Sequence, residues 1–239
     1  MHSDKFIYIL ITCMSIVVSV LLSFTFTILD PKYQSNVELD RIKNILQIAG
    51  YETETMSKDQ IEKLYKSFTE IILKQSGDTI DNVSYSNLEI GDELPSGETV
   101  FLLNDDRVFP LFKDTKNNIL VVPISGKGLW GTLYGYFAIN NDGSVAGITF
   151  YKHKETPGLG GEVDSKWFQD QFNNSKNVFK KGELVSLQIK KPGVITEGDR
   201  YSVNGISGAT ITSNGLQNFL MTDLSNYKKF IKNSFLSDE

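Results

Sequence analysis

The clearest fold signal in this chain is the run Leu133-Tyr134-Gly135-Tyr136-Phe137-Ala138-Ile139, followed by Asn140-Asn141-Asp142-Gly143 and then by Val145 to Tyr151. The two outer runs are rich in aromatic and β-branched residues, which favour strands. The Asp-Gly pair between them is a strong β-hairpin signal. A similar run, Leu120-Val121-Val122-Pro123-Ile124, precedes them. The stretch therefore predicts neighbouring antiparallel strands.

Strands and a helix are also expected beyond this hairpin. One strand is predicted from Leu184 to Lys190, ended by Pro192-Gly193, and a short one over Tyr201-Ser202-Val203. The final helix is predicted from Ser213 to about Lys232, with an apolar face at helical spacing formed by Leu216, Phe219, Leu220, Leu224, Tyr227 and Phe230. Helices that bracket hairpin-joined strands are typical of an α+β domain with mainly antiparallel sheet.

The N-terminal part contains a candidate transmembrane helix. Phe6 to Leu29 form an uncharged run of 24 residues, and a helix of that length at about 1.5 Å per residue crosses a hydrocarbon core of about 30 Å. A cleaved signal peptide is the alternative. The run is longer than the usual apolar region of about 7–15 residues and ends in Ile28-Leu29-Asp30-Pro31 instead of a small-residue cleavage site, so an uncleaved anchor is favoured.

Four parts are therefore expected: a short tail (1–5), a single transmembrane helix (6–29), a helical and irregular membrane-proximal part (30–118) and the α+β domain (119–239). In the third part, Lys32 to Tyr51 is amphipathic and continues the membrane helix. A second helix begins at the capping-box pair Ser57 and Gln60 and continues to Gly77, with one apolar face formed by Ile61, Leu64, Tyr65, Phe68, Ile71 and Ile72. Residues 78–106 have no readable periodicity.

Composition excludes several classes of function. The formal net charge of −5 and the absence of a basic run argue against a nucleic-acid surface. Cys13 is the only cysteine and lies in the apolar span, while His2 and His153 are the only histidines. Disulfides, iron–sulfur or zinc centres and most histidine-based triads are thereby excluded, and no metal ligands are expected. Any redox chemistry has to come from an organic cofactor.

The segment Ser207-Gly208-Ala209-Thr210-Ile211-Thr212-Ser213 joins the last predicted strand to the last helix. Unpaired N–H groups and the positive end of the helix dipole favour a phosphate at such a start. The alternative is an ordinary helix start with Thr212 or Ser213 as N-cap and Gly208 in the turn.

Two glycine-rich loops carry further candidates. Ser125-Gly126-Lys127-Gly128-Leu129-Trp130-Gly131 places an aromatic ring among glycines, either as a platform for a flat ligand or as a plug in the core. His153-Lys154-Glu155-Thr156-Pro157-Gly158-Leu159-Gly160-Gly161-Glu162 turns at Pro157-Gly158 and exposes backbone N–H groups beside a carboxylate. His153 alone indicates no function.

The chain resembles the C subunit of the Na⁺-translocating NADH:quinone reductase (Nqr), whose domain belongs to the FMN-binding domain family. The resemblance rests on four segments in the same order: the N-terminal span, the two glycine-rich loops and Asn204-Gly205-Ile206-Ser207-Gly208-Ala209-Thr210-Ile211-Thr212-Ser213. The resemblance covers nearly the whole chain. One departure is Asn204, where that family's attachment motif usually has aspartate. Asparagine keeps the shape but not the charge, so Asn204→Asp is expected to leave flavin attachment intact or to quicken it.

The resemblance implies a covalent FMN. A separate flavin transferase, using FAD and Mg²⁺, would join FMN to Thr210 by a phosphodiester, so that Thr210 is an acceptor and the chain has no catalytic residue. Further cofactor contacts are expected in two groups, at the flavin ring from Trp130, Glu155, Leu159 and Gly160, and at the phosphate from Ser207, Gly208, Ala209, Thr212 and Ser213.

The resemblance also implies the function and the location. The expected role is to relay single electrons from the iron–sulfur-containing, NADH-oxidising subunit towards the flavin and quinone sites of the other Nqr subunits, in the bacterial inner membrane, with the soluble domain in the periplasm. Without a dinucleotide-binding fingerprint, the chain should not oxidise NADH unaided. Two alternatives stay open: the G subunit of an Rnf ferredoxin:NAD⁺ oxidoreductase complex, and a membrane-tethered assembly module without cofactor.

Overall fold

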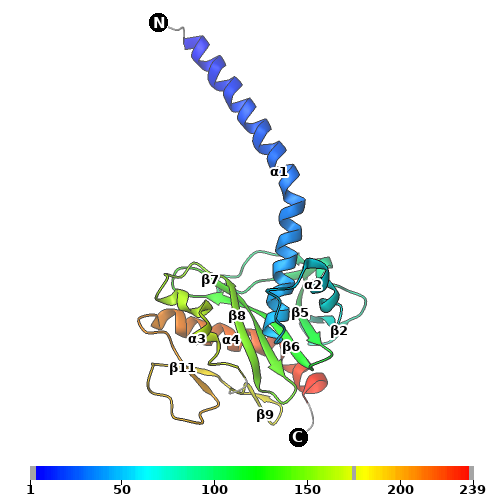
Figure 1. Cartoon of the computed structure of the whole chain (residues 1–239), viewed down its shortest axis with the longest axis vertical. Helices are drawn as coiled ribbons and strands as arrows, with labels where there is room; N and C mark the ends of the chain where they lie inside the picture. Colours follow the sequence, from blue (N-terminus) through cyan, green and yellow to red (C-terminus); the bar gives the residue numbers. More distant parts are fainter. Residues whose placement is uncertain (1–3, 174–175, 237–239) are drawn as a thin grey trace. The chain divides into compact units, whose positions relative to one another are not determined.

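A computed structural model describes residues 4–173 and 176–236 (Figure 1). The chain divides into two compact units, Met1–Ile42 and Lys43–Glu239. Most of helix α1 (Asp4–Ile48) makes up the first unit, and the second contains every strand found in the described residues.

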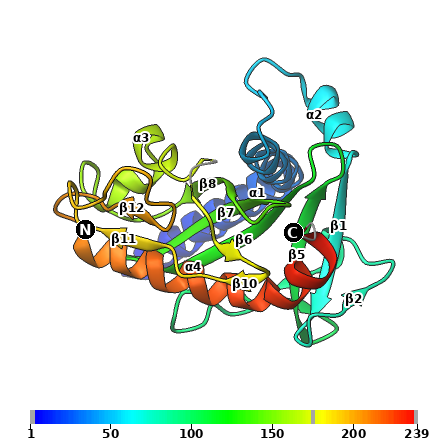
Figure 2. The same ribbon diagram turned by 90° about the horizontal axis from the view of Figure 1, so that it is seen from below.

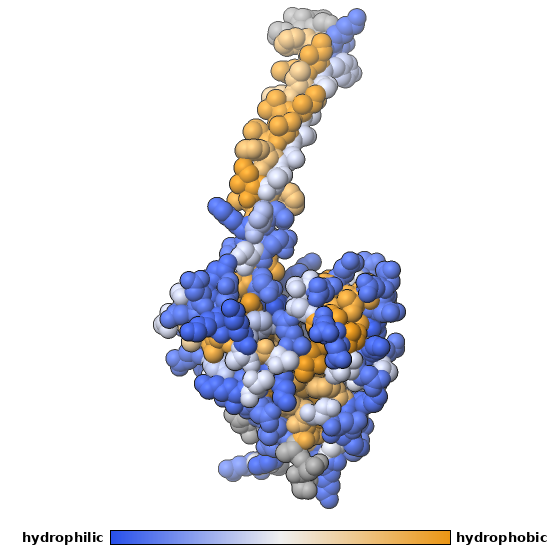
Figure 3. Space-filling view, turned by 90° about the vertical axis from the view of Figure 1, so that its right-hand side faces the viewer, coloured by the Kyte–Doolittle hydropathy of each residue, from blue (hydrophilic) through white to orange (hydrophobic). Residues whose placement is uncertain are grey.

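Helix α1 contains the predicted span. It runs without interruption through Pro31 to Ile48, as expected for the amphipathic continuation after residue 32. The large apolar side chains from Phe6 to Leu29 are exposed, and they line the helix in Figure 3. Among the described residues, α1 is the one helix that is long and apolar enough to cross a membrane, and it lies near the N-terminus, where a signal sequence passes the same test.

An eight-stranded antiparallel sheet forms the centre of the second unit. The order is β2-β1-β5-β6-β7-β8, and β4 joins β5 to β3. The predicted hairpin is confirmed as β7 and β8, with Gly143 in the turn at φ +80°. The strands are β1 (Phe68–Lys74), β2 (Thr79–Ile80), β3 (Glu89–Ile90), β4 (Phe101–Leu103), β5 (Asp106–Asp114), β6 (Ile119–Lys127), β7 (Thr132–Asn140) and β8 (Val145–Lys152).

The second half of the chain adds short strands and the last helices. Strands β9 (Phe179–Lys180) and β10 (Glu183–Leu184) are antiparallel, whereas β11 (Gln188–Lys190) and β12 (Ser202–Asn204) are parallel. The single strand predicted from 184 to 190 is therefore wrong, since this segment belongs to two separate pairs. The helical elements after α1 are α2 (Lys58–Tyr65), α3 (Lys166–Gln169), α4 (Thr210–Phe230), two 3₁₀ turns (Tyr85–Asn87 and Gly160–Asp164) and a π-helical turn (Ile231–Phe235).

The helix predicted from Ser57 to Gly77 is partly wrong. Its capping box is present, but α2 ends at Tyr65, and residues 68–74 form β1. Phe68, Ile71 and Ile72 suit a helix by spacing, yet seven consecutive residues of β1 pair with β5. Long-range pairing outweighs local periodicity here. The part expected to be helical and irregular, 30–118, thus supplies strands to the same sheet as residues 119–152.

Helix α4 packs along one face of the sheet, where Figure 2 shows it in orange. Leu120, Val122 and Ile124 point from β6 into a core that they share with Leu216 and Leu220 of α4. The two backbones approach closely at two glycines. A Cβ atom at Gly126 would overlap the Phe219 side chain, and one at Gly215 would overlap the backbone oxygen of Lys127. This packing places the start of α4 beside the loop that follows β6.

We expect Gly126→Ala to destabilise the second unit by about 1–3 kcal/mol, because the added methyl group overpacks the contact between β6 and α4. Denaturant unfolding of the purified full chain measures the effect, with the exposed Ser186→Ala as the control. Equal midpoints for Gly126→Ala and wild type would show that α4 does not pack this closely.

Candidate functional site

Thr210 is the first residue of α4, and its side chain is exposed. The N-cap residue is Ala209, whose side chain cannot accept a hydrogen bond, so Thr212 or Ser213 as N-cap is wrong. Within residues 4–173 and 176–236, the Thr210 hydroxyl makes no hydrogen bond. The start of α4 therefore offers a free hydroxyl beside N–H groups that no side chain caps.

The turn before α4 is held by its own backbone and by Ser213. Gly208 has φ +75°, a left-handed conformation that favours glycine. Ala209 N–H donates to Ile206 O at 3.1 Å, and Ile206 N–H donates to Ser213 Oγ at 3.3 Å. Ser207 and Gly208 are exposed, whereas Ala209 and Ser213 are buried. Of the residues expected at a phosphate, Ser207 and Thr210 have accessible side chains.

Glu155 connects three segments of the site. Its side chain is 5% exposed, and its carboxylate accepts the Trp130 N–H at 2.8 Å and the Thr212 hydroxyl at 2.5 Å. His153 Nδ1 accepts the Glu155 N–H at 3.2 Å. The loops 128–131 and 153–160 and the first turn of α4, all predicted from the sequence, therefore meet at this carboxylate.

Two glycines make room for Glu155. A Cβ atom at Gly160 would overlap the Glu155 carboxylate and lie 2.6 Å from Thr212 Oγ1. One at Gly128 would lie 2.6 Å from the other carboxylate oxygen. Gly160 and Glu155 are both buried, so these residues, predicted as ring contacts, shape the site from below its surface.

Large apolar side chains remain exposed on these same segments. Trp130 is 68% exposed and Leu159 44% exposed. The interpretation of Trp130 as a core plug is therefore wrong. Leu159 lies against the turn before Thr210, because a Cβ atom at Gly208 would be 3.0 Å from its Cδ2. Leu129 and Ile211 are also exposed. The arrangement offers apolar contacts to a flat ligand near the Thr210 hydroxyl.

A loop that the sequence left unassigned supports the Trp130 loop. Lys127 Nζ and the Thr132 hydroxyl donate to Glu93 Oε1 at 2.7 and 2.8 Å, and the Tyr134 hydroxyl donates to its other oxygen. These contacts, led by Lys127, lower the pKa of Glu93 to about 2. Lys127 N–H also donates to Ser96 O at 2.9 Å. No spacing in 91–99 signals this role, since the contacts are long-range.

A groove of about 700 Å³ adjoins the turn before Thr210. Trp167 stands in its wall, where its Nε1–H donates to Glu162 Oε2 at 2.8 Å. Sequence reasoning did not single out Trp167 or Gln171, which lie outside the glycine loops. The full lining is Gly158, Glu162, Trp167, Gln171, Pro192, Gly193, Ile195, Asn204, Gly205, Ile206 and Ser207.

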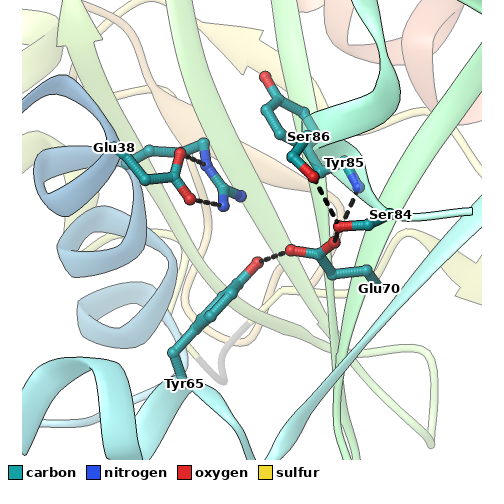
Figure 4. A network of polar contacts seen from close by, with 7 residues as sticks. Glu38, Tyr65, Glu70, Ser84, Tyr85 and Ser86 are labelled. Atoms are coloured by element: carbon teal, nitrogen blue, oxygen red, sulfur yellow. Dashed lines mark hydrogen bonds and ion pairs between the residues drawn. The ribbon is translucent and has the colours of Figure 1, made fainter. Parts of the chain in front are cut away.

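A second polar network is structural (Figure 4). Glu70 accepts the Tyr65 hydroxyl at 2.7 Å, the Ser84 hydroxyl at 2.6 Å and the Tyr85 N–H at 2.8 Å. It thereby joins β1 to the end of α2 and to the 3₁₀ turn at Tyr85–Asn87. Figure 4 also shows Glu38 of α1, which accepts from Arg41. The carboxylates of Glu70 and Glu38 thus have hydrogen-bond donors from the protein itself, and nothing in this network points to a bound ligand.

Comparison with known proteins identifies the class of this site. Residues 128–224, which include Trp130 of the first glycine loop, the whole second loop and Thr210, match the model of the FMN-binding domain family. The chain is thus an FMN-binding α+β protein with a long apolar N-terminal helix.

The relatives narrow this class to one family. The C subunit of the Na⁺-translocating NADH-quinone reductase from Pseudomonas aeruginosa is 34% identical over 229 residues, covering 88% of this chain and 87% of that protein. The C subunit of the same reductase from Pasteurella multocida is 31% identical and covers 88% and 85%. The crystal structure of the C subunit from Parabacteroides distasonis has a TM-score of 0.68 at 27% identity, covering 85% of this chain and 96% of that chain. The chain belongs to this family of C subunits, which confirms the resemblance seen in the sequence.

Glu155→Ala should lower the free energy of unfolding by about 2 kcal/mol, because the Trp130 N–H and the buried Thr212 hydroxyl lose their acceptor. Glu155→Gln keeps an acceptor and should lose clearly less. Denaturant unfolding of the full chain measures both, with the exposed Glu52→Ala as the control. Equal losses for Ala and Gln would mean that the charge, not the hydrogen bonding, stabilises the loops.

Proposed function

We propose that this chain is the FMN-carrying C subunit of a Na⁺-translocating NADH-quinone reductase, and that its FMN is joined through a phosphodiester to the Oγ1 atom of Thr210. The observation that supports this most strongly is the exposed Thr210 hydroxyl, without a hydrogen bond in the described structure, at the first residue of α4. It lies inside the segment that matches the FMN-binding domain.

The attachment requires a donor of activated FMN. With FAD as that donor, the Thr210 hydroxyl forms a bond to the FMN phosphorus while the pyrophosphate bond of FAD breaks. AMP leaves and the hydroxyl proton is released, so no oxidant or reductant is consumed. A separate flavin transferase with Mg²⁺ performs this step, and Thr210 is its acceptor.

The chain's own residues then hold the cofactor. The first turn of α4 favours the negative charge of the phosphodiester through its N–H groups and dipole, and the Ser207 hydroxyl is accessible beside it. Trp130 and Leu159 supply apolar contacts for the ring system. Glu155, Gly160, Thr212 and Ser213 are buried, and their role is to position these segments. FMN supplies one-electron chemistry, and the tether keeps it from being lost.

The remaining assignments concern partners and location. The chain works among the other Nqr subunits, accepting single electrons from the iron–sulfur, NADH-oxidising subunit and passing them towards flavin and quinone sites. The apolar part of α1 anchors it as a single transmembrane helix, and the second unit faces the periplasm. The relatives named above support Nqr over the G subunit of an Rnf complex. Flavin colour in the purified protein would exclude an assembly module without cofactor.

Thr210→Ala should abolish covalent flavin, whereas Thr212→Ala should largely preserve it, because the Thr212 hydroxyl is buried against Glu155. Co-expression with the transferase, followed by denaturing gels under ultraviolet light and intact mass, tests both variants. The wild-type band should fluoresce only when the transferase is present. A fluorescent band that persists in Thr210→Ala would move the attachment to another residue.

The topology can be tested with a unique thiol. Because Cys13 lies in the apolar span, Ser96→Cys would carry the single cysteine of the second unit, at an exposed position. An impermeant maleimide added to spheroplasts should label this site if residues 32–239 are translocated. Labelling that occurs only after lysis would place the second unit in the cytoplasm while leaving the flavin assignment unaffected.

A further inference from the structure

The side chains of Gln171 and Asn204 form a pair of amides beside residues 205–210, which we call the acceptor loop because they end at Thr210. Gln171 Oε1 accepts the Asn204 backbone N–H at 2.9 Å and the Asn204 Nδ2–H at 3.1 Å. Gln171 Nε2 donates to the Asn204 backbone oxygen at 3.2 Å. We call this set of three hydrogen bonds the amide pair. Both residues line the groove that includes Ser207.

The backbone of Asn204 determines how both amides are oriented. A backbone N–H can only donate, so the Gln171 atom facing it has to be oxygen. A carbonyl oxygen can only accept, so the other Gln171 atom has to be nitrogen. The Asn204 side-chain atom that faces Gln171 Oε1 must then be a donor, and its other atom, Oδ1, accepts the Gly193 N–H at 3.2 Å. Position 204 therefore needs one donor and one acceptor.

An aspartate cannot meet this requirement when it is ionised, because it offers two acceptors and no donor. It would set a carboxylate oxygen against Gln171 Oε1. Rotating the Gln171 amide does not relieve the contact, since that places nitrogen against the backbone N–H and oxygen against the backbone carbonyl. Although the sequence alone suggests that Asn204→Asp is harmless, the geometry points the other way.

The amide pair also reaches the acceptor loop. Asn204 ends β12, and the next residue, Gly205, donates its N–H to Lys190 O at 2.7 Å. Ile206 then donates to Ser213 inside the first turn of α4. In the segment from Asn204 to Thr210, the amide pair thus holds Asn204 and the Ser213 hydroxyl holds Ile206.

We propose that Gln171, through Asn204, is a positioning residue for flavin attachment in this chain, and that position 204 requires an amide instead of a carboxylate. The proposal rests on the proposed attachment to Thr210. In this chain, position 204 acts through its hydrogen bonds and not through a negative charge. Gln171 and Asn204 together hold the acceptor loop in the conformation that the transferase recognises.

The first test is the rate of flavin attachment to the purified full chain in detergent, with purified transferase, FAD and Mg²⁺ at pH 7. Asn204→Asp should be labelled about tenfold more slowly than wild type at a low concentration of the chain. Gln171→Glu should also be slower, because it loses the donor to the Asn204 carbonyl. The matched control is Asn218→Asp, the same change at an exposed position of α4, which should be labelled at the wild-type rate.

The second test is the pH profile of thermal unfolding without flavin. The introduced carboxyl group faces Gln171 Oε1, which raises its pKa in the folded state above the ordinary aspartate value of about 3.9. Once protonated it regains a donor. The melting temperature of Asn204→Asp should therefore match wild type near pH 3, where the group is protonated in both states, and fall below it as the pH rises through the raised pKa.

The proposal is overturned if Asn204→Asp is labelled as fast as wild type or faster, or if its deficit in melting temperature does not change with pH. Failure of the wild-type chain to take up any flavin would instead overturn the attachment to Thr210. In that case the pH profile still decides whether position 204 requires an amide.

Discussion

The close packing of α4 on β6 is the contact on which the site depends. It brings the helix backbone against the strand at Gly126 and Gly215, where no larger residue fits without displacement. A buried hydrogen bond accompanies it, because Asp223 of α4 accepts the Ser125 N–H at 2.7 Å. Burial raises the pKa of Asp223 well above its ordinary value. The start of α4 is thereby placed beside the glycine loop that follows β6.

Polar contacts then fix the glycine loops against the start of α4. The carboxylate of Glu155 accepts from Trp130 and from Thr212, so two loops and a helix start meet at one buried group. The Glu155 carboxylate is buried and accepts hydrogen bonds from the protein, so the exposed surface of the site is formed by Trp130, Leu159 and Thr210. In the proposed site, the buried Glu155 side chain positions the segments, and the uncapped start of α4 is left for the cofactor.

Local patterns predicted several parts correctly, for identifiable reasons. The β7–β8 hairpin follows from an Asp-Gly turn between two apolar runs, and the capping box of α2 follows from Ser57 and Gln60. Both signals act over a few residues, so neighbouring sequence is sufficient. By contrast, residues 68–74 match a helical period but form a strand, because the pairing partner β5 lies more than 30 residues away. The helix predicted from Ser213 begins three residues earlier, at Thr210, and the alternative of Thr212 or Ser213 as its N-cap is wrong, since the Thr212 hydroxyl donates to the distant Glu155 carboxylate.

The sequence by itself determined the apolar N-terminal helix, the antiparallel character of the sheet, the two glycine loops and the threonine-containing junction between the last strand and the last helix. Each of these depends on spacing or residue type within a short segment. Only the tertiary structure decided that Trp130 is exposed, that Glu155 is buried between Trp130 and Thr212, that Glu93 supports the glycine loop, and that Gln171 pairs with Asn204. These are contacts between residues separated by 25 to 57 positions. Whether a polar group becomes buried, and which partner satisfies it, depends on how the sheet and α4 bring such distant segments together.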